Sequence, residues 1–235
     1  MYNQIDANKR KTWLLMALFG VFIIGIGWFL DFYYKGGTGI LIIAIIISIL
    51  MSLTSYYQAD KLALWSTGAK EIKKADNPYV YRLVENLCIA AGAPMPKVHI
   101  INSPALNAFA TGRNPEHASI AFTTGIISAL ENEELEGVIA HELSHIKNYD
   151  ILVMTVVVVL VGVIALIGNF FLRAQFFGHG RRSSNDRGGN VGAIIMVIGL
   201  IFMILSPILA EIIKLAISRK REYLADASGA LLTRY

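Results

Sequence analysis

The sequence contains, near its middle, the stretch His141-Glu142-Leu143-Ser144-His145, and the rest of the chain is best interpreted from it. On an α-helix, residues four apart project from the same face, one turn apart. Two neutral imidazoles placed in this way can bind one Zn²⁺, and Glu142 then flanks the position where a water would bind. The competing interpretation is that both are ordinary surface or core histidines. With only 5 His in 235 residues, two at this spacing around a glutamate favour a metal site.

The residues around this motif predict a helix that lies in water. Asn132 is a good N-cap, and Glu133 and Glu134 follow it in the first turn, where the helix dipole favours negative charge. Apolar residues then recur at helical spacing, namely Leu135, Val138, Ile139, Leu143 and Ile146. The charged residues of the segment place this helix beside a bilayer rather than inside it.

The composition indicates a membrane protein, because the chain is 55% hydrophobic and only 16% charged. Four charge-free stretches reach about 20 residues, the length that crosses a bilayer. They are residues 12–30, 36–57, 151–172 and 188–210. Lys9, Arg10 and Lys11 precede the first stretch, which predicts a retained signal anchor with a cytoplasmic N-terminus. Residues 31–35 then form a short turn on the outside.

The second pair of hydrophobic stretches is open to two interpretations. The loop between them carries Arg173, Arg181, Arg182 and Arg187 against the single acid Asp186, on the side predicted to be outside. This departs from the rule that basic loops stay in the cytoplasm. The pair therefore either crosses the membrane twice or forms a hairpin that lies in the interface. In both cases the chain returns to the side it left.

The segment between the second and third stretches predicts a small α+β unit. A helix begins at Asn77-Pro78 and ends at Gly92. Three runs with strand composition follow, at residues 97–101, 106–111 and 118–122. Residues 56–74 are expected to be helical, continuing out of the second stretch.

A zinc site with two histidines needs at least one more protein ligand, and Glu222 is the candidate. It lies on a second predicted helix after the last hydrophobic stretch, with Asp226 four residues later on the same face. Asp226 would accept a hydrogen bond from a ligand imidazole. Taken alone, these two acids are more typical of surface ion pairs with the neighbouring Arg and Lys residues.

Four segments carry a resemblance to a known family. They are residues 107–112 (Asn-Ala-Phe-Ala-Thr-Gly), 134–138 (Glu-Leu-Glu-Gly-Val), 141–146 with Asn148 and Asp150, and 218–226. With these, nearly the whole chain resembles the HtpX-type integral-membrane zinc metallopeptidases, which are related to the eukaryotic CaaX prenyl-protein proteases. The resemblance implies that His141, His145 and Glu222 bind one Zn²⁺ per chain. It also implies that Glu142 is the catalytic base and that Asp226 supports a zinc-binding histidine.

The expected fold is a mostly α membrane protein. It has four hydrophobic transmembrane helices and a cytosolic α+β zincin-like metallopeptidase domain with a small sheet. Residues 1–57 would form an N-terminal membrane hairpin, 58–150 the cytosolic metallopeptidase part, 151–210 a second membrane hairpin, and 211–235 a return helix with the third ligand. Members of the family continue into further C-terminal helices, so the chain is expected to be truncated relative to them.

The role implied by the resemblance is proteolytic quality control. The substrates would be misfolded membrane proteins or unfolded polypeptides, cut in cytosolic or juxtamembrane segments. The site and the N-terminus would face the cytoplasm of a bacterial or archaeal cell, at the lipid bilayer of its plasma membrane. No nucleic-acid partner is expected.

The sheet edge is the expected substrate-binding element. Asn107, Ala108, Phe109 and Ala110 would pair with the substrate backbone, their small side chains allowing close approach. An ordinary buried strand is the alternative. For the whole chain, the alternatives are an intramembrane protease of the site-2 class and a non-proteolytic metal transporter or structural zinc membrane protein.

Overall fold

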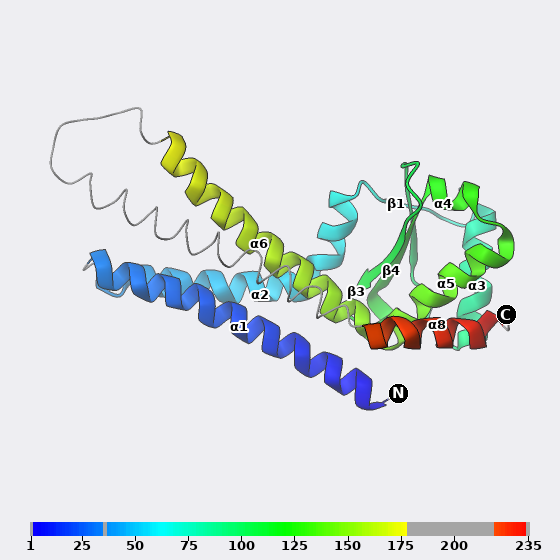
Figure 1. The fold of residues 1–235 in the computed structure, drawn as a ribbon, viewed down its shortest axis with the longest axis horizontal. Coiled ribbons are helices and arrows are strands. Elements are labelled where there is room, and N and C mark those ends of the chain that lie inside the picture. Colours follow the sequence, from blue (N-terminus) through cyan, green and yellow to red (C-terminus); the bar gives the residue numbers. More distant parts are fainter. Residues whose placement is uncertain (1, 35–36, 178–218, 234–235) are drawn as a thin grey trace.

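Two long helices form a hairpin that projects from an α+β unit (Figure 1). The structure is a computed structural model and describes residues 2–34, 37–177 and 219–233. Helix α1 spans Tyr2–Tyr34 and helix α2 spans Gly39–Ser66. The turn expected at residues 31–35 therefore starts later, because α1 continues to Tyr34.

Asp31 closes the end of the hairpin that lies away from the α+β unit. Its buried carboxylate accepts hydrogen bonds from the backbone N–H groups of Ile40 and Leu41, at 3.2 and 2.7 Å. The first N–H groups of a helix have no partner within it, so α1 caps α2 through this side chain. Nearby, Gly27 lets the helices approach closely, because a Cβ there would collide with Ala44.

The outer surface of the hairpin is apolar. Many large side chains on it are more than half exposed, among them Leu14, Leu18, Val21, Ile42 and Ile46. Water-soluble proteins rarely expose such a continuous apolar surface, whereas lipid tails would cover it. Within the described residues, α1 and α2 are each long and apolar enough to cross a bilayer.

Helix α6 (Asp150–Phe177) contains the third expected stretch and packs on the hairpin through Leu152, Val156, Leu160 and Ile164. Together with α5 (Asn132–Lys147) it forms a third candidate span, with an 83° bend between the two helices. Of the four expected spans, the last (188–210) lies outside the described residues, as do residues 178–187 of the basic loop before it. The described part of the chain thus supports two spans, and a third if the bent pair counts as one.

The sheet is mixed and has the strand order β1-β2-β4-β3. Its strands are Lys70–Glu71 (β1), Lys97–Ile101 (β2), Ala108–Gly112 (β3) and Ala118–Thr123 (β4). Strands β2 and β4 are parallel, and the two outer pairs are antiparallel. Strand β3 therefore lies at an edge of the sheet, with β4 on one side only.

Two boundaries differ from those predicted. The helix expected over residues 56–74 ends at Ser66, because Gly68 turns the backbone with a φ of 68°, and Lys70–Glu71 then pairs with β2. The strand expected over 106–111 starts at Ala108. Just before it, the Thr123 hydroxyl bonds the backbone of Ala105 and of Asn107, so this segment is held by a side chain in addition to one backbone bond from Thr123 N–H.

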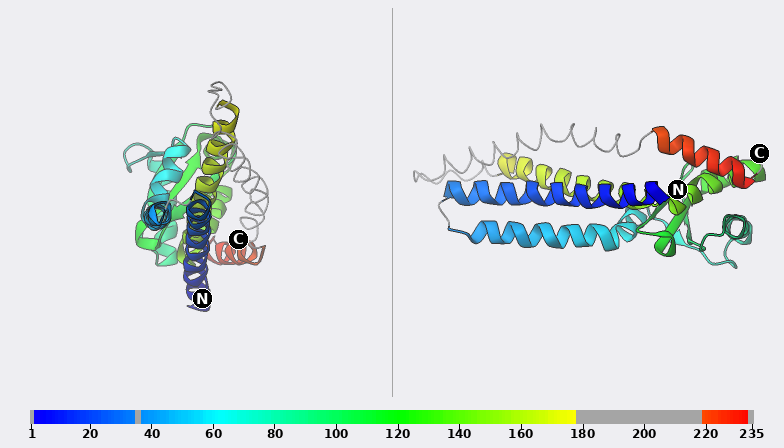
Figure 2. Two further views of the ribbon diagram at one scale, coloured as in Figure 1. Left: turned by 90° about the vertical axis from the view of Figure 1, so that its left-hand side faces the viewer. Right: turned by 90° about the horizontal axis from the view of Figure 1, so that it is seen from below.

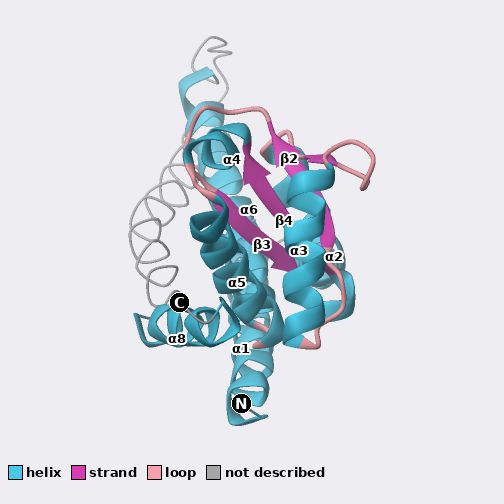
Figure 3. Cartoon of the chain, turned by 90° about the vertical axis from the view of Figure 1, so that its right-hand side faces the viewer, coloured by secondary structure: helices cyan, strands magenta, loops and turns pink. Residues whose placement is uncertain are grey.

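Helices α3 (Pro78–Ala91) and α5 cover one face of the sheet (Figure 3). Helix α3 begins and ends as predicted, with the Asn77 side chain accepting from Val80 N–H and Gly92 closing the helix at a φ of 60°. The core between these layers contains the largest fully buried side chains of the unit, including Phe122, Ile120, Leu135, Ile139 and Leu143. Two short elements, η1 (Pro115–His117) and α4 (Thr124–Ala129), flank β4.

Candidate metal centre

Helix α5 carries His141 and His145, and its start differs by one residue from the prediction. Glu131, not Asn132, is the N-cap, because Glu131 and Glu134 form a reciprocal capping box in which Glu134 accepts from Glu131 N–H at 2.9 Å. The helix then ends at Lys147 without a break. Its buried apolar face packs on the sheet, so both histidines have a fixed position.

Helix α8 (Arg219–Thr233) lies across α5 and brings Glu222 to the histidines (Figures 1 and 2). The Nε2 atoms of His141 and His145 lie 3.1 Å apart. The Glu222 Oε2 atom lies 3.4 Å from His141 Nε2 and 3.8 Å from His145 Nε2. The structure thus places the three expected ligands together, with their donor atoms within 4.8 Å of one another.

Each imidazole directs its other nitrogen to a carboxylate. His141 Nδ1 lies 2.8 Å from Asp226 Oδ1, and His145 Nδ1 lies 3.1 Å from Asp150 Oδ2. If both Nδ1 atoms donate, both Nε2 atoms present lone pairs to each other across 3.1 Å, which is unfavourable unless a cation lies between them.

The donor set fits one Zn²⁺. Tetrahedral zinc with bonds of about 2.0–2.1 Å places its ligand atoms roughly 3.3–3.4 Å from one another. The observed separations of 3.1, 3.4 and 3.8 Å bracket this value. Two imidazoles and one carboxylate also leave the fourth position open, as catalytic zinc sites do.

Asp150 is the part of this centre whose role the sequence does not predict. On a continuous helix, a residue five positions after His145 would point to another face. Here Tyr149, with a φ of 60°, ends α5 and turns the chain into α6, which returns the Asp150 carboxylate to the ring. Its side chain is only 5% exposed, whereas that of Asp226 is 67% exposed.

The charges around His145 stabilise its protonated form. Burial lowers the pKa of His145, but the hydrogen bond that its Nδ1–H donates to Asp150 and the negative charges of Glu142, Asp150 and Glu222 outweigh burial, so the net shift is upward. A cation at the Nε2 side would meet the same favourable potential. The centre is therefore built to hold positive charge.

Glu142 points toward strand β3. Burial raises the pKa of its carboxyl group, while His145, His141 and the backbone amide of Ala110 favour the ionised form and reduce the shift. A carboxylate with a raised pKa, next to an open metal position, has the properties of a general base.

The edge of β3 that faces away from β4 lies beside Glu142. Thr123 N–H donates to Asn107 C=O, so residues 107, 109 and 111 bond to β4. The backbone groups of Ala108 and Ala110 therefore point outward. Of the four residues expected to bind substrate, Ala108, Phe109 and Ala110 lie in β3, whereas Asn107 precedes it.

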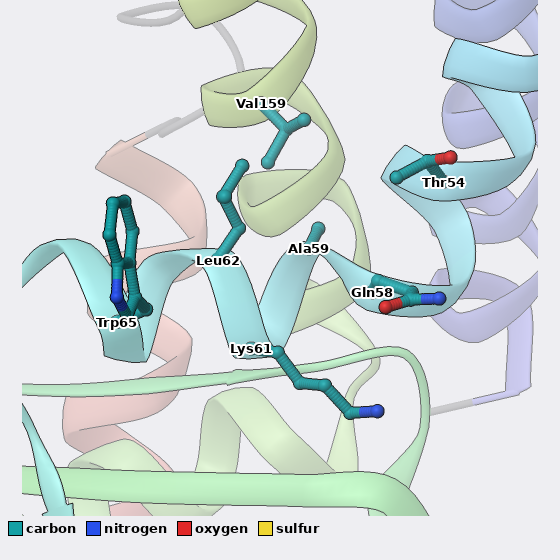
Figure 4. Close-up of a pocket in the computed structure, with 7 residues that line it drawn as sticks. All are labelled: Thr54, Gln58, Ala59, Lys61, Leu62, Trp65 and Val159. Atoms are coloured by element: carbon teal, nitrogen blue, oxygen red, sulfur yellow. The ribbon is translucent and has the colours of Figure 1, made fainter.

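An open pocket lies elsewhere, between the end of α2 and α6 (Figure 4). Its lining residues are Thr54, Gln58, Ala59, Lys61, Leu62, Trp65 and Val159. None of them is a histidine, a cysteine or an acid, so this pocket is not a second metal centre.

The chain is similar to known proteins in sequence and in fold. Residues 74–234 match Peptidase family M48. The Protease HtpX homolog of Caldanaerobacter subterraneus subsp. tengcongensis is 46% identical over 235 residues, which cover 100% of this chain and 78% of the relative. That of Lactobacillus acidophilus is 47% identical over 239 residues, with 100% and 80% covered.

Among solved structures, the crystal structure of S. mikatae Ste24p has a similar fold, with a TM-score of 0.50 and 18% identity. The match covers 99% of this chain and 57% of that chain, so this chain spans little more than half of that structure. At this identity the likeness concerns the fold alone.

Proposed function

Because this chain belongs to peptidase family M48 and is a metallopeptidase of the membrane, we propose that it is a zinc endopeptidase that cleaves cytosolic or juxtamembrane segments of membrane proteins. One observation carries the proposal. The donor atoms of His141, His145 and Glu222 converge from two helices. The half-buried Glu142 lies between the histidines in sequence and beside the edge strand β3.

The proposed reaction is hydrolysis of a peptide bond. Zinc, when bound, would polarise the scissile carbonyl and lower the pKa of a water molecule. Glu142 takes the proton from the attacking water and later delivers it to the leaving amine. Asp226 and Asp150 hold the two imidazoles by their Nδ1 atoms, which leaves both Nε2 atoms free for the metal.

Substrate binding is assigned to the outer edge of β3. An extended peptide can add to a sheet edge through main-chain hydrogen bonds. The outward backbone groups of Ala108 and the outward C=O group of Ala110 are suited to this, since the Ala110 N–H already faces Glu142. The methyl side chains of both residues let a second backbone approach. The register would bring a substrate carbonyl close to Glu142.

The cytoplasmic orientation rests on charge. The N-terminal end of α1, which carries Lys9, Arg10 and Lys11, lies at the same end of the hairpin as the α+β unit (Figures 1 and 2). Basic flanks of membrane helices favour the cytoplasmic side. We therefore place the metal centre in the cytoplasm, next to the membrane, with misfolded or unfolded membrane proteins as substrates.

The variant Glu142→Gln tests the mechanism in the detergent-purified chain. We expect it to bind one zinc per chain, as the unmodified protein does, and to lose about 10²–10⁴-fold in kcat, the usual contribution of a general base. Zinc is measured by elemental analysis, and cleavage is measured on a single-span membrane protein with a flexible cytosolic segment.

Two results would oppose the proposal. Full cleavage activity in Glu142→Gln would show that Glu142 is not the general base. Cleavage sites confined to the bilayer interior of the substrate would favour an intramembrane protease of the site-2 class.

A further inference from the structure

The carboxylate of Asp150 connects four helices. Its Oδ2 atom contacts His145 on α5, and its Oδ1 atom lies 2.7 Å from Asn8 Nδ2 on α1 and 3.5 Å from Arg221 Nη1 on α8. The residue itself begins α6. Arg221 also forms an ion pair with this carboxylate, but its contact is at the limit of a hydrogen bond, so Asn8 makes the shorter hydrogen bond to Oδ1.

Asn8 is buried, with 4% of its surface exposed, although it lies on a helix that leads into the membrane. Its Nδ2 atom also donates to the backbone oxygen of Asn148 at 3.0 Å. The next residue, Lys9, places its ammonium group 4.8 Å from the centre of the Tyr149 ring. The first turns of α1 thus contact all three residues of the corner between α5 and α6.

This corner needs support from outside. Tyr149 has a φ of 60°, a strained conformation that bulky residues rarely adopt. The corner determines where the Asp150 carboxylate points. Without the amide of Asn8, the carboxylate would lose its shortest hydrogen bond and be freer to rotate away from His145.

We propose that Asn8, on the membrane helix α1, is a positioning residue for the metal centre, acting through Asp150 on the imidazole of His145. The hairpin is then more than an anchor, because it supplies part of the framework that orients a metal ligand. The inference rests on the proposed zinc site, and its consequence is that zinc affinity depends on a residue of the N-terminal hairpin.

The test is zinc affinity in the full chain purified in detergent, measured by competition with a chromophoric chelator. Removing a carboxylate that orients a metal-binding histidine typically weakens affinity about 10–100-fold, which we expect for Asp150→Ala. For Asn8→Ala, which removes one hydrogen bond to that carboxylate, we expect a loss of about threefold to tenfold. Asn8→Gln keeps an amide and should recover part of it.

Thr12→Ala is the matched control. Thr12 lies one turn further along α1 and is also buried, and its one hydroxyl bond among the described residues goes to the Asn8 backbone oxygen. It should leave zinc affinity unchanged. Cobalt substitution adds a spectroscopic readout, since the visible absorption of bound Co²⁺ should change in Asn8→Ala and stay as in the unmodified protein in Thr12→Ala.

The decisive measurement is the zinc affinity of the double variant Asn8→Ala/Asp150→Ala. If Asn8 acts through Asp150, then Asn8→Ala should have no further effect on zinc affinity in the Asp150→Ala background. An additive effect there, an unchanged affinity in Asn8→Ala, or an equal loss in Thr12→Ala would each overturn the inference. If the unmodified chain itself bound no zinc, the proposed function would fail instead, so the two failures are distinct.

Discussion

Asp226 Oδ1 lies 2.8 Å from His141 Nδ1, although 85 residues separate the two in the sequence. The contact joins α8 to α5 at the metal centre. Because the Asp226 side chain is 67% exposed, water can replace part of its function when it is removed. The buried Asp150 has no such substitute, so the two carboxylates that face the histidines should differ in their effects.

We therefore predict that Asp226→Ala weakens zinc affinity by about tenfold, at the lower end of the range for such contacts. Asp150→Ala should weaken it more strongly. Chelator competition on both variants measures the difference. Equal losses for the exposed and the buried acid would contradict the prediction.

Gly229 is predicted to set the distance between α8 and α5. A Cβ at this position would lie 3.4 Å from the backbone nitrogen of His141, so Gly229→Ala should be tolerated. Gly229→Leu should push α8 away and remove Glu222 from the histidines, with an overpacking cost of about 1–3 kcal/mol.

The measurement for this pair is zinc affinity together with thermal unfolding. Ala230→Leu is the control, since Ala230 is the next residue on α8 and is exposed. If Gly229→Leu bound zinc as tightly as Ala230→Leu, the contact between the two helices would not determine the metal centre.

The pH dependence of cleavage should report on Glu142. Burial raises its pKa from the ordinary value of 4.5, so the carboxyl group stays protonated to a higher pH than that of an exposed glutamate. A protonated carboxyl group cannot accept a proton from water. We predict that kcat/KM falls as the pH decreases, with a midpoint above 4.5. Zinc content measured at each pH separates this loss from release of the metal.

The outer edge of β3 should be needed for substrate but not for zinc. Ala108→Pro removes an N–H group that points away from β4, which an edge strand tolerates. We predict a loss of about threefold to tenfold in kcat/KM, the value of one hydrogen bond, with unchanged zinc content. Phe109→Pro is the contrasting variant. It removes an N–H group from the ladder with β4, so it should lower the thermal stability as well.

Cys88 should serve as a built-in probe of folding. It is the only cysteine of the chain, it is buried in α3, and burial raises the pKa of its thiol to about 11. The reactive thiolate is therefore scarce at neutral pH. We predict negligible labelling by a thiol reagent in the folded protein and complete labelling after denaturation. Rapid labelling under native conditions would show that α3 does not stay packed on the sheet.

The sequence predicted the elements of the α+β unit because their signals are local. Helix α3 begins at Asn77-Pro78 and ends at Gly92 as predicted, because capping interactions act within one helical turn. Glu131 and Asn132 are adjacent, and either side chain can cap the start of α5. The reciprocal hydrogen bonds between Glu131 and Glu134 make Glu131 the N-cap. The end of α2 was harder to predict, because Lys70 and Glu71 become a strand only by pairing with β2.

For the metal centre, spacing alone predicted that His141 and His145 share a face. Placing Glu222 beside them required the family resemblance, because its charged neighbours suggest an ordinary surface helix. The role of Asp150 was not predicted, because the residue that turns the chain before it is Tyr149. A glycine at that position would have indicated a turn, whereas a tyrosine does not. The contact of Asn8 with Asp150 joins residues 142 positions apart and depends wholly on how α1 packs.

The 83° bend between α5 and α6 has a consequence for which bonds can be cut. Since α6 enters the apolar region directly after the bend, α5 runs sideways from it and His145 lies only about one helical turn, roughly 5 Å, from the corner. In the proposed function, the metal would therefore lie close to the membrane surface. A substrate would need only a few extended residues, at about 3.3 Å each, to reach the metal. Lengthening the exposed segment of a single-span substrate one residue at a time would measure this distance directly. Cleavage that required a long segment would show that the metal lies farther from the membrane than proposed.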